Sequence, residues 1–111
     1  MGGRMSRTKG SRGEREVAEK LRENGFEASR NARNGISGMA GGQDISHSLD
    51  GYWIEVKRAE KWSLPAWIRQ AERDAGDEEV PLVVFRSSRQ PWRVVLDFDK
   101  FLELMREAKG V

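Results

Sequence analysis

The stretch GGQDISHSLDGYWIEVKRAE, residues 41–60, contains the pattern that decides the fold. A half-buried strand alternates its side chains between two faces with a period of two residues. The segment 52–57 fits this pattern, and one face of the predicted strand carries Tyr52, Ile54 and Val56. The other face carries Trp53, Glu55 and Lys57. Two opposite charges therefore lie side by side on one face of a strand that is otherwise apolar.

The composition limits the class of protein to which the chain belongs. Its 111 residues are enough for one domain with a single modest core. Hydrophobic residues make up 37% and charged residues 34%, and no apolar run approaches the roughly 18–20 residues of a membrane span. Residues 1–16 lack the apolar core of a signal peptide, and the absence of cysteine excludes disulfides and thiolate metal sites. We therefore expect a soluble cytoplasmic protein with no membrane partner.

Basic residues gather in two segments that contain no acid. The net charge is only +2, but residues 1–12 carry four basic residues in a Gly/Ser-rich context and residues 28–43 carry two more. Basic side chains on mobile segments neutralise phosphates and release counterions, which is the sequence-independent part of DNA affinity. We predict a flexible basic arm over residues 1–10, serving either DNA contact or solubility, and a single domain over residues 11–111.

Hydrophobic periodicity predicts three helices and five strands in the order α-β-β-β-α-β-β-α. The first helix is expected to begin at Ser11 and to end at residues 24–25. The second helix should begin near Ser63, and Asp99 should cap the third. The strands are expected at residues 26–30, 44–48, 52–57, 80–86 and 92–98. The fold class is α/β, with a mixed central sheet flanked by helices.

The dipeptide Asp50-Gly51 predicts how the two strands around it pair. Asp-Gly between two strand patterns favours a hairpin with a two-residue turn. In that register Asp44 lies opposite Lys57 and diagonal to Glu55, so all three point to one face. A slip of one residue would separate them, so this geometry depends on the register.

Glu14 adds a further carboxylate from the first helix. At 100° per residue it falls within the apolar stripe of that helix, whereas Glu16 and Glu19 point away. A capping box with Ser11 explains a glutamate at this position. The same side chain at the rim of the core also has the reach to enter a site above the sheet, and the two roles are compatible.

Three carboxylates and a lysine on one face have a specific chemical use. Hard divalent cations such as Mg²⁺ take oxygen ligands from carboxylates, waters and substrate phosphates, and they lower the pKa of a bound water. A nearby lysine orients that water or offsets charge in the transition state. An isolated Glu-x-Lys is common, and as a solvated ion pair it contributes about 0–1 kcal/mol. The combination with the upstream acids is what indicates phosphodiester hydrolysis.

The combination extends over four segments of the chain: KGSRGEREVAEKLRENGFEASRNA (9–32), QDI (43–45), IEVK (54–57) and VPLVVFRSSRQPWRVV (80–95). Together they resemble the PD-(D/E)XK nuclease superfamily, and more closely the archaeal-type Holliday junction resolvases with their phage-encoded relatives. The likeness covers most of the chain in the family's order and spacing. It departs at residues 33–43, a longer and more glycine-rich loop, and at Gln43, which stands where the family has proline.

The resemblance implies a restriction-endonuclease-like core with its metal centre on the central sheet. The catalytic residues implied are Glu14, Asp44, Glu55 and Lys57. The metal ligands implied are Glu14, Asp44, Glu55 and the backbone carbonyl of Val56. The cofactor would be Mg²⁺, with Mn²⁺ able to substitute, and no organic cofactor is expected. The residues expected to contact DNA are Arg4, Arg7, Lys9, Arg12, Arg15, Arg30, Arg33 and Arg86.

The function implied is the resolution of four-way (Holliday) junctions in branched DNA. A homodimer would place one site on each of two strands, and each hydrolysis would leave a 5′-phosphate and a 3′-hydroxyl. For a phage-encoded chain the location would be the host cytoplasm. Two alternatives remain open: another nuclease of the same superfamily acting on branched or linear DNA, and a non-catalytic DNA-binding module.

A few further residues have two possible roles each. Gln70 flanks the apolar stripe of the second predicted helix, where it is either a solvated side chain or an accessory to the site. His47 is expected to have a structural or surface role. Trp53 shares the charged face and is a candidate wall of the site. The remaining tryptophans are expected in the core or, for one of them, in a dimer interface; they are Trp62, Trp67 and Trp92.

Overall fold

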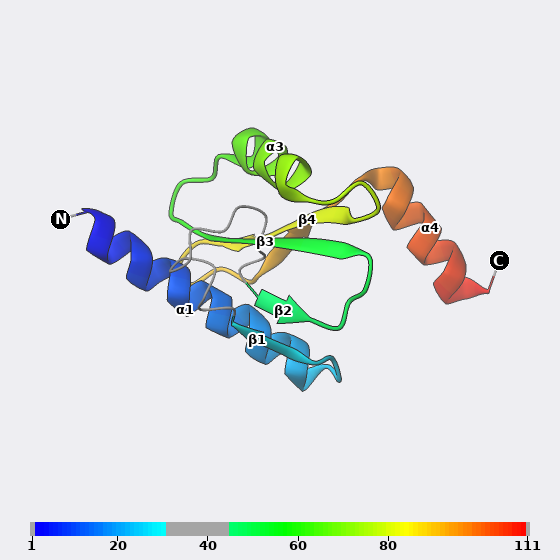
Figure 1. The fold of residues 1–111 in the computed structure, drawn as a ribbon, viewed down its shortest axis with the longest axis horizontal. Coiled ribbons are helices and arrows are strands. Elements are labelled where there is room, and N and C mark those ends of the chain that lie inside the picture. The colour runs from blue at the N-terminus through cyan, green and yellow to red at the C-terminus, as the bar shows by residue number, and fades with distance from the viewer. Residues whose placement is uncertain (1, 31–44, 111) are drawn as a thin grey trace.

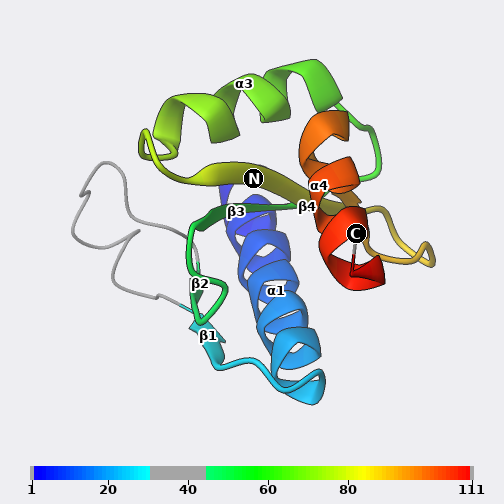
Figure 2. The same ribbon diagram turned by 90° about the vertical axis from the view of Figure 1, so that its right-hand side faces the viewer.

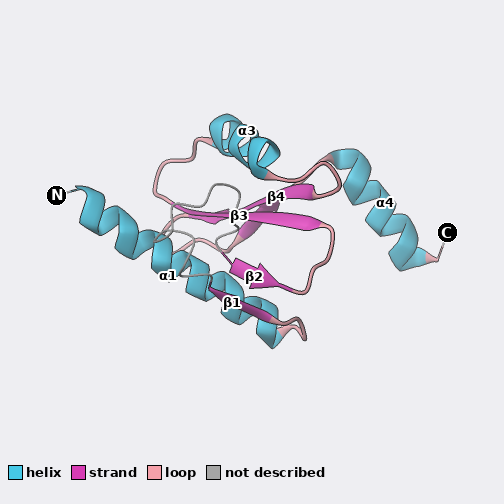
Figure 3. Ribbon diagram, viewed as in Figure 1, coloured by secondary structure: helices cyan, strands magenta, loops and turns pink. Residues whose placement is uncertain are grey.

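The structure is a computed structural model that describes residues 2–30 and 45–110, with residues 2–11 described by their backbone alone. The elements follow one another in the predicted order (Figures 1 and 3). They are α1 (Gly2–Glu23), β1 (Ala28–Arg30), β2 (Ile45–His47), β3 (Tyr52–Arg58), α3 (Leu64–Asp74), β4 (Val80–Arg86), β5 (Arg93–Val95) and α4 (Phe98–Lys109). The α/β class and the predicted order of elements are therefore confirmed.

Strands β3, β4 and β5 form a mixed three-stranded sheet with β4 at its centre. β3 runs parallel to β4, so that Tyr52 lies opposite Val80 and Arg58 lies opposite Arg86. β5 is antiparallel to β4. The uninterrupted apolar run of β4 has the composition expected of an interior strand that is covered on both faces.

Two helices cover the two faces of this sheet (Figure 2). Helix α1 packs against the face that carries Ile54 and Val56, together with Val17 and Ala18 of its own apolar stripe. Helix α3 packs against the opposite face, where Trp53, Ala71, Val83 and Phe85 are buried. The predicted division of residues 52–57 into two faces is therefore confirmed. The charged face of β3 lies under α3.

Helix α1 begins at Gly2, not at Ser11 as predicted. Ser11 is thus inside the helix and cannot be its N-cap, and residues 2–10, expected as a flexible arm, are helical. Once a helix is nucleated, each added residue gains one hydrogen bond, so its start moves outward through residues that tolerate helix. The helix comes close to the sheet at Gly13, where an added Cβ would lie 3.2 Å from the Cβ of Arg58.

The predicted pairing of the second and third strands is wrong within the described residues. β2 pairs with β1 in a separate two-stranded sheet, with Ala28 opposite His47. The turn itself forms as expected, because Gly51 has φ +86° and the Tyr52 amide donates to the Leu49 carbonyl at 3.3 Å. The chain beyond this turn pairs with β4. A turn brings two strands near each other, but the available partners decide which ladder forms.

Helix α4 begins at Phe98 after Asp97, two residues before the predicted cap, and the shortened β5 ends at Val95. It lies at one end of the molecule, beyond the sheet (Figure 1). It ends at Gly110, whose left-handed φ of +72° is typical of a helix C-cap. Among the helices in the described part of the chain, none has the length and apolar character needed to cross a bilayer.

Candidate active site

The charged face of β3 holds the residues around which the candidate site is built. Glu55 is 6% exposed and is the one buried charged residue in residues 12–30 and 45–110. Its Oε2 lies 3.5 Å from Lys57 Nζ, two positions further along the strand. Burial of a carboxylate is costly unless partners compensate its charge, so a glutamate retained here needs its neighbours.

Gln70 of α3 connects the two charged side chains. Its Nε2 donates a hydrogen bond to Glu55 Oε2 at 3.1 Å, and its Oε1 accepts one from Lys57 Nζ at 2.9 Å. An amide can do both because it carries a donor and an acceptor on the same planar group. The sequence left two roles open for Gln70, a solvated side chain or an accessory to the site. The structure places it within the charged group.

These contacts hold the Glu55 carboxylate and the Lys57 ammonium in a defined arrangement. On the other side of the carboxylate, Trp53 Nε1 lies 3.4 Å from Glu55 Oε1. Trp53 is itself 5% exposed and packs in the core under α3, so it forms a wall beside the glutamate. A carboxylate and an ammonium held in a partly dry site interact more strongly with a developing charge than they would in water.

Glu14 is held by a different partner. It lies on α1, which covers the opposite face of β3, and its Oε1 accepts a hydrogen bond from Arg30 Nε at 2.9 Å. Its side chain is 18% exposed. In the described part of the chain, no three acidic or histidine residues are grouped closely enough to hold a metal ion. The convergence of Glu14 with the strand acids therefore stays a prediction.

Asp44 lies outside the described residues, so its placement relative to Glu55 also stays a prediction. The donors that the site does offer suit a hard cation, because a buried carboxylate supplies oxygen and the described residues contain no thiolate. The backbone carbonyl of Val56, on the next residue of β3, is an oxygen of the same kind. The residues present therefore fit a divalent cation such as Mg²⁺.

The structure separates the predicted DNA-contacting arginines into paired and exposed ones. Arg30 is paired with Glu14, and Arg86 lies 3.4 Å from a carboxylate oxygen of Glu16. Arg12 and Arg15 of α1 are exposed. Arg33 is outside the described residues, and the side chains of the three remaining candidates are not described: Arg4, Arg7 and Lys9.

Glu16 has contacts that the sequence did not predict. Its carboxylate accepts a hydrogen bond from Trp92 Nε1 at 3.2 Å and lies 3.8 Å from Arg58 Nε. The Arg86 guanidinium also stacks over the Trp92 ring, 5.5 Å from its centroid. The helical wheel placed Glu16 away from the apolar stripe, but its carboxylate meets Trp92 and the last residues of β3 and β4, so it does not point away from the sheet. No sequence pattern indicates this cluster, because its members lie on elements that are far apart in the chain.

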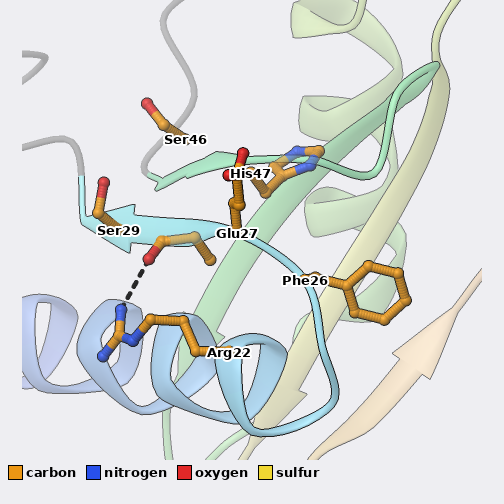
Figure 4. A pocket seen from close by; sticks show the side chains of 7 residues that line it. Arg22, Phe26, Glu27, Ser29, Ser46 and His47 are labelled. Atoms are coloured by element: carbon orange, nitrogen blue, oxygen red, sulfur yellow. Dashed lines mark hydrogen bonds between the residues drawn. The ribbon is translucent and has the colours of Figure 1, made fainter.

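A shallow hollow near β1 and β2 is separate from the charged face (Figure 4). Its volume is about 570 Å³, and Arg22, Phe26, Glu27, Ala28, Ser29, Ser46 and His47 line it. His47 Nδ1 accepts a hydrogen bond from the Leu49 amide at 3.1 Å, and burial lowers the pKa of this imidazole from 6.5. The contact supports the expected structural role of His47.

The family is decided by a sequence comparison. Residues 5–110 match the sequence model of the family described as "Phage putative PDDEXK endonuclease". The chain belongs to this family. Among curated proteins no sequence is significantly similar. Among solved structures, the chain is similar to the 1.6 Å structure of Archaeoglobus fulgidus Hjc, a Holliday junction resolvase from an archaeal hyperthermophile.

The likeness to Hjc extends over most of both molecules. It has a TM-score of 0.53 and 25% sequence identity, and it covers 77% of this chain and 73% of that one. The PDDEXK family membership and the shared fold identify the protein as a DNA endonuclease. Within it, Gln70 bridges Glu55 and Lys57 of the Glu55-x-Lys57 tripeptide on β3.

Proposed function

We propose that this PDDEXK endonuclease is a divalent-metal-dependent resolvase of four-way (Holliday) DNA junctions. The observation that carries the proposal is the bridged group of Glu55, Lys57 and Gln70 on β3, buried under α3. Its place in a fold similar to that of Hjc supports the choice of a junction over other DNA. The reaction proposed is the addition of water to phosphorus with cleavage of the P–O3′ bond, leaving a 5′-phosphate and a 3′-hydroxyl.

The metal site proposed consists of oxygen ligands from Glu14, Asp44, Glu55 and the Val56 carbonyl. A bound Mg²⁺, or Mn²⁺ in its place, would neutralise the phosphodiester and supply a water of lowered pKa. The residues of the chain do the rest of the work. Glu55 is held by the Gln70 amide, so its orientation is fixed before substrate arrives.

Lys57 is proposed to orient the attacking water and to offset the charge that develops on the phosphate oxygens. Its Nζ donates a hydrogen bond to Gln70 Oε1 at 2.9 Å and lies 3.5 Å from Glu55 Oε2. These two contacts fix the position of the ammonium group. Preorganised charges of this kind act without the reorganisation that solvent would need. Gln70 is then a positioning residue, since it acts through Glu55 and Lys57.

A homodimer is proposed because one junction needs two strands to be cut. Two identical sites related by a two-fold axis would make paired nicks in opposite strands. The phosphate contacts proposed come first from exposed Arg12 and Arg15, with Arg4, Arg7, Lys9 and Arg33 in addition. Arg30 and Arg86 are proposed as weaker contributors, because each is already paired with a glutamate. For a phage-encoded enzyme, the host cytoplasm is the proposed location.

The test compares a labelled immobile four-way junction with a linear duplex of matched sequence. Each substrate is incubated with Mg²⁺ or with EDTA, using the wild-type protein and the variant Glu55→Gln. The matched control is Glu72→Gln, which changes an exposed carboxylate on α3. We expect paired nicks in the junction alone, abolished by EDTA and reduced about 100-fold or more in Glu55→Gln, with Glu72→Gln unaffected.

Other outcomes would identify the alternatives. Equal cutting of the junction and the duplex would retain the nuclease and reject junction selectivity. Binding of the junction without cleavage in either Mg²⁺ or Mn²⁺ would reject the catalytic proposal and leave a DNA-binding module. Unchanged cleavage by Glu55→Gln would show that the strand carboxylate is not part of the active site.

A further inference from the structure

Helix α4 presents an apolar stripe to solvent. Phe98 is 70% exposed, and Phe101, Leu102 and Met105 are 38–42% exposed. These positions follow the spacing i, i+3, i+4 and i+7, so they share one face of the helix. No residue of α4 is buried. A helix on the surface of a globular domain ordinarily turns such a stripe toward the core.

Phe98, at the start of the stripe, borders a hollow that Ile68 and Ala71 of α3 also line, so α4 meets the rest of the described chain there as well as along its other side. Leu104 lines an apolar hollow with Leu49, Tyr52 and Leu82, and the Lys100 ammonium lies 5.8 Å from the centre of the Tyr52 ring. The helix has only 12 residues. Isolated helices shorter than about 12–15 residues are marginal in water, so α4 needs packing to be stable. The exposed stripe is the surface that can provide it.

The charges along the stripe identify which partner fits. At 100° per residue, Asp99 and Arg106 flank the same edge of the stripe, at opposite ends of the helix. They are seven residues apart, about 10.5 Å along the axis, so they cannot pair within one chain. If two copies of α4 pack antiparallel about a two-fold axis near Leu102, Asp99 of each copy lies beside Arg106 of the other. The antiparallel helix dipoles are also favourable.

We propose that α4 is the surface through which two copies of this chain form a symmetric dimer. Leu102 lies beside the two-fold axis and faces its own copy, and Phe101 packs against Met105 of the second copy. The interface is isologous, because the same stripe serves both copies. This inference specifies the homodimer of the proposed function and rests on that pairing, but not on the proposed chemistry.

The first test measures the oligomeric state by sedimentation velocity without DNA. We expect the wild-type protein to sediment with twice the 12.6 kDa mass of one chain. Leu102→Lys places two ammonium groups face to face at the axis and should give the monomer. The control is Phe26→Lys, a comparable change at a side chain that is 40% exposed and outside α4, which should remain dimeric. A monomeric wild type up to ~100 μM would overturn the proposal, since dimers of specific function commonly have Kd values far below that.

A charge exchange makes the test independent of folding. Asp99→Arg and Arg106→Asp should each weaken the dimer by about tenfold, since each places like charges together. The double variant should restore it, because the pair re-forms across the axis in reverse. The α4 interface would be rejected if the double variant dimerised as weakly as the added effects of the two single variants predict. It would also be rejected if Leu102→Lys remained dimeric.

Nuclease assays on the same variants separate this inference from the proposed function. Monomeric Leu102→Lys should nick junctions singly instead of in pairs, while keeping its metal-dependent hydrolysis. A dimer through α4 in a protein that cuts no DNA would support the interface and reject the chemistry. Paired cleavage by a protein that dimerises through another surface would support the proposed function and reject the α4 interface.

Discussion

Replacement of Glu16 by alanine should destabilise the protein more than replacement of any neighbouring glutamate. Its carboxylate accepts a hydrogen bond from Trp92 and lies within 4 Å of Arg58 and Arg86. The side chains of these arginines are 11% and 22% exposed. Their Nε atoms are buried without a hydrogen-bond partner in the described structure, so Glu16 is their main compensation. Glu16→Ala would leave two largely buried guanidinium groups without their counter-charge.

The size of the loss follows from these contacts. Breaking a fully buried ion pair from one side costs about 3–5 kcal/mol. Glu16 is 29% exposed and its two ion pairs are longer than hydrogen bonds, so water compensates part of that cost. We expect Glu16→Ala to lower the free energy of unfolding by about 2 kcal/mol. For a domain of this size, that is a fall in Tm of about 8 °C.

Urea and thermal unfolding followed by circular dichroism would measure this loss. Glu16→Gln keeps an oxygen for Trp92 but removes the charge, so it should fall between alanine and wild type. Glu19→Gln, on the exposed side of the same helix, is the control and should change stability by less than about 0.5 kcal/mol. If Glu16→Gln were as stable as Glu19→Gln, the charge of Glu16 would not be what compensates the arginines.

Three further predictions concern the site, the pH dependence and the packing of α1. Gln70→Ala should lower kcat by about tenfold to a hundredfold with little change in junction affinity. The reason is that it removes hydrogen bonds to two charged groups that act in the chemical step. A change confined to affinity would contradict its positioning role. Burial lowers the pKa of His47 in the folded protein below 6.5, so the unfolded chain binds a proton first as the pH falls and the free energy of unfolding decreases there. In urea titrations above and below this pH, His47→Gln should show a smaller decrease. An unchanged decrease would assign the pH dependence to other groups. Gly13→Leu should lower Tm, since its side chain would meet Arg58, Val56 and Trp92 within 3.5 Å at the Cβ alone, and a neutral result would mean that α1 can lift from the sheet.

The two faces of β3 could be predicted from the sequence because they follow from a local rule. A period of two residues fixes which side chains share a face, whatever the strand pairs with. Trp53, Glu55 and Lys57 were therefore assigned together, and the structure places them together under α3. The fold class and the order of elements follow from patterns of the same kind.

The ladder of β2 could not be predicted in the same way. The turn at Asp50-Gly51 was correctly located, but the pairing partner of β2 is β1. Strand pairing is a choice among several edges, and it depends on lengths and packing that a dipeptide does not encode. The start of α1 was misplaced for a related reason, since a capping signal competes with continued helix formation.

The sequence by itself determined which residues are available for chemistry, namely an acid and a lysine on one face of an apolar strand. Only the tertiary structure decided what holds them. Gln70 lies between Glu55 and Lys57 because α3 packs on that face, and Glu16 meets Arg58 and Arg86 because α1 packs on the other. Periodicity describes one element at a time. Contacts between residues distant in sequence arise only when packing of the apolar faces brings their elements together.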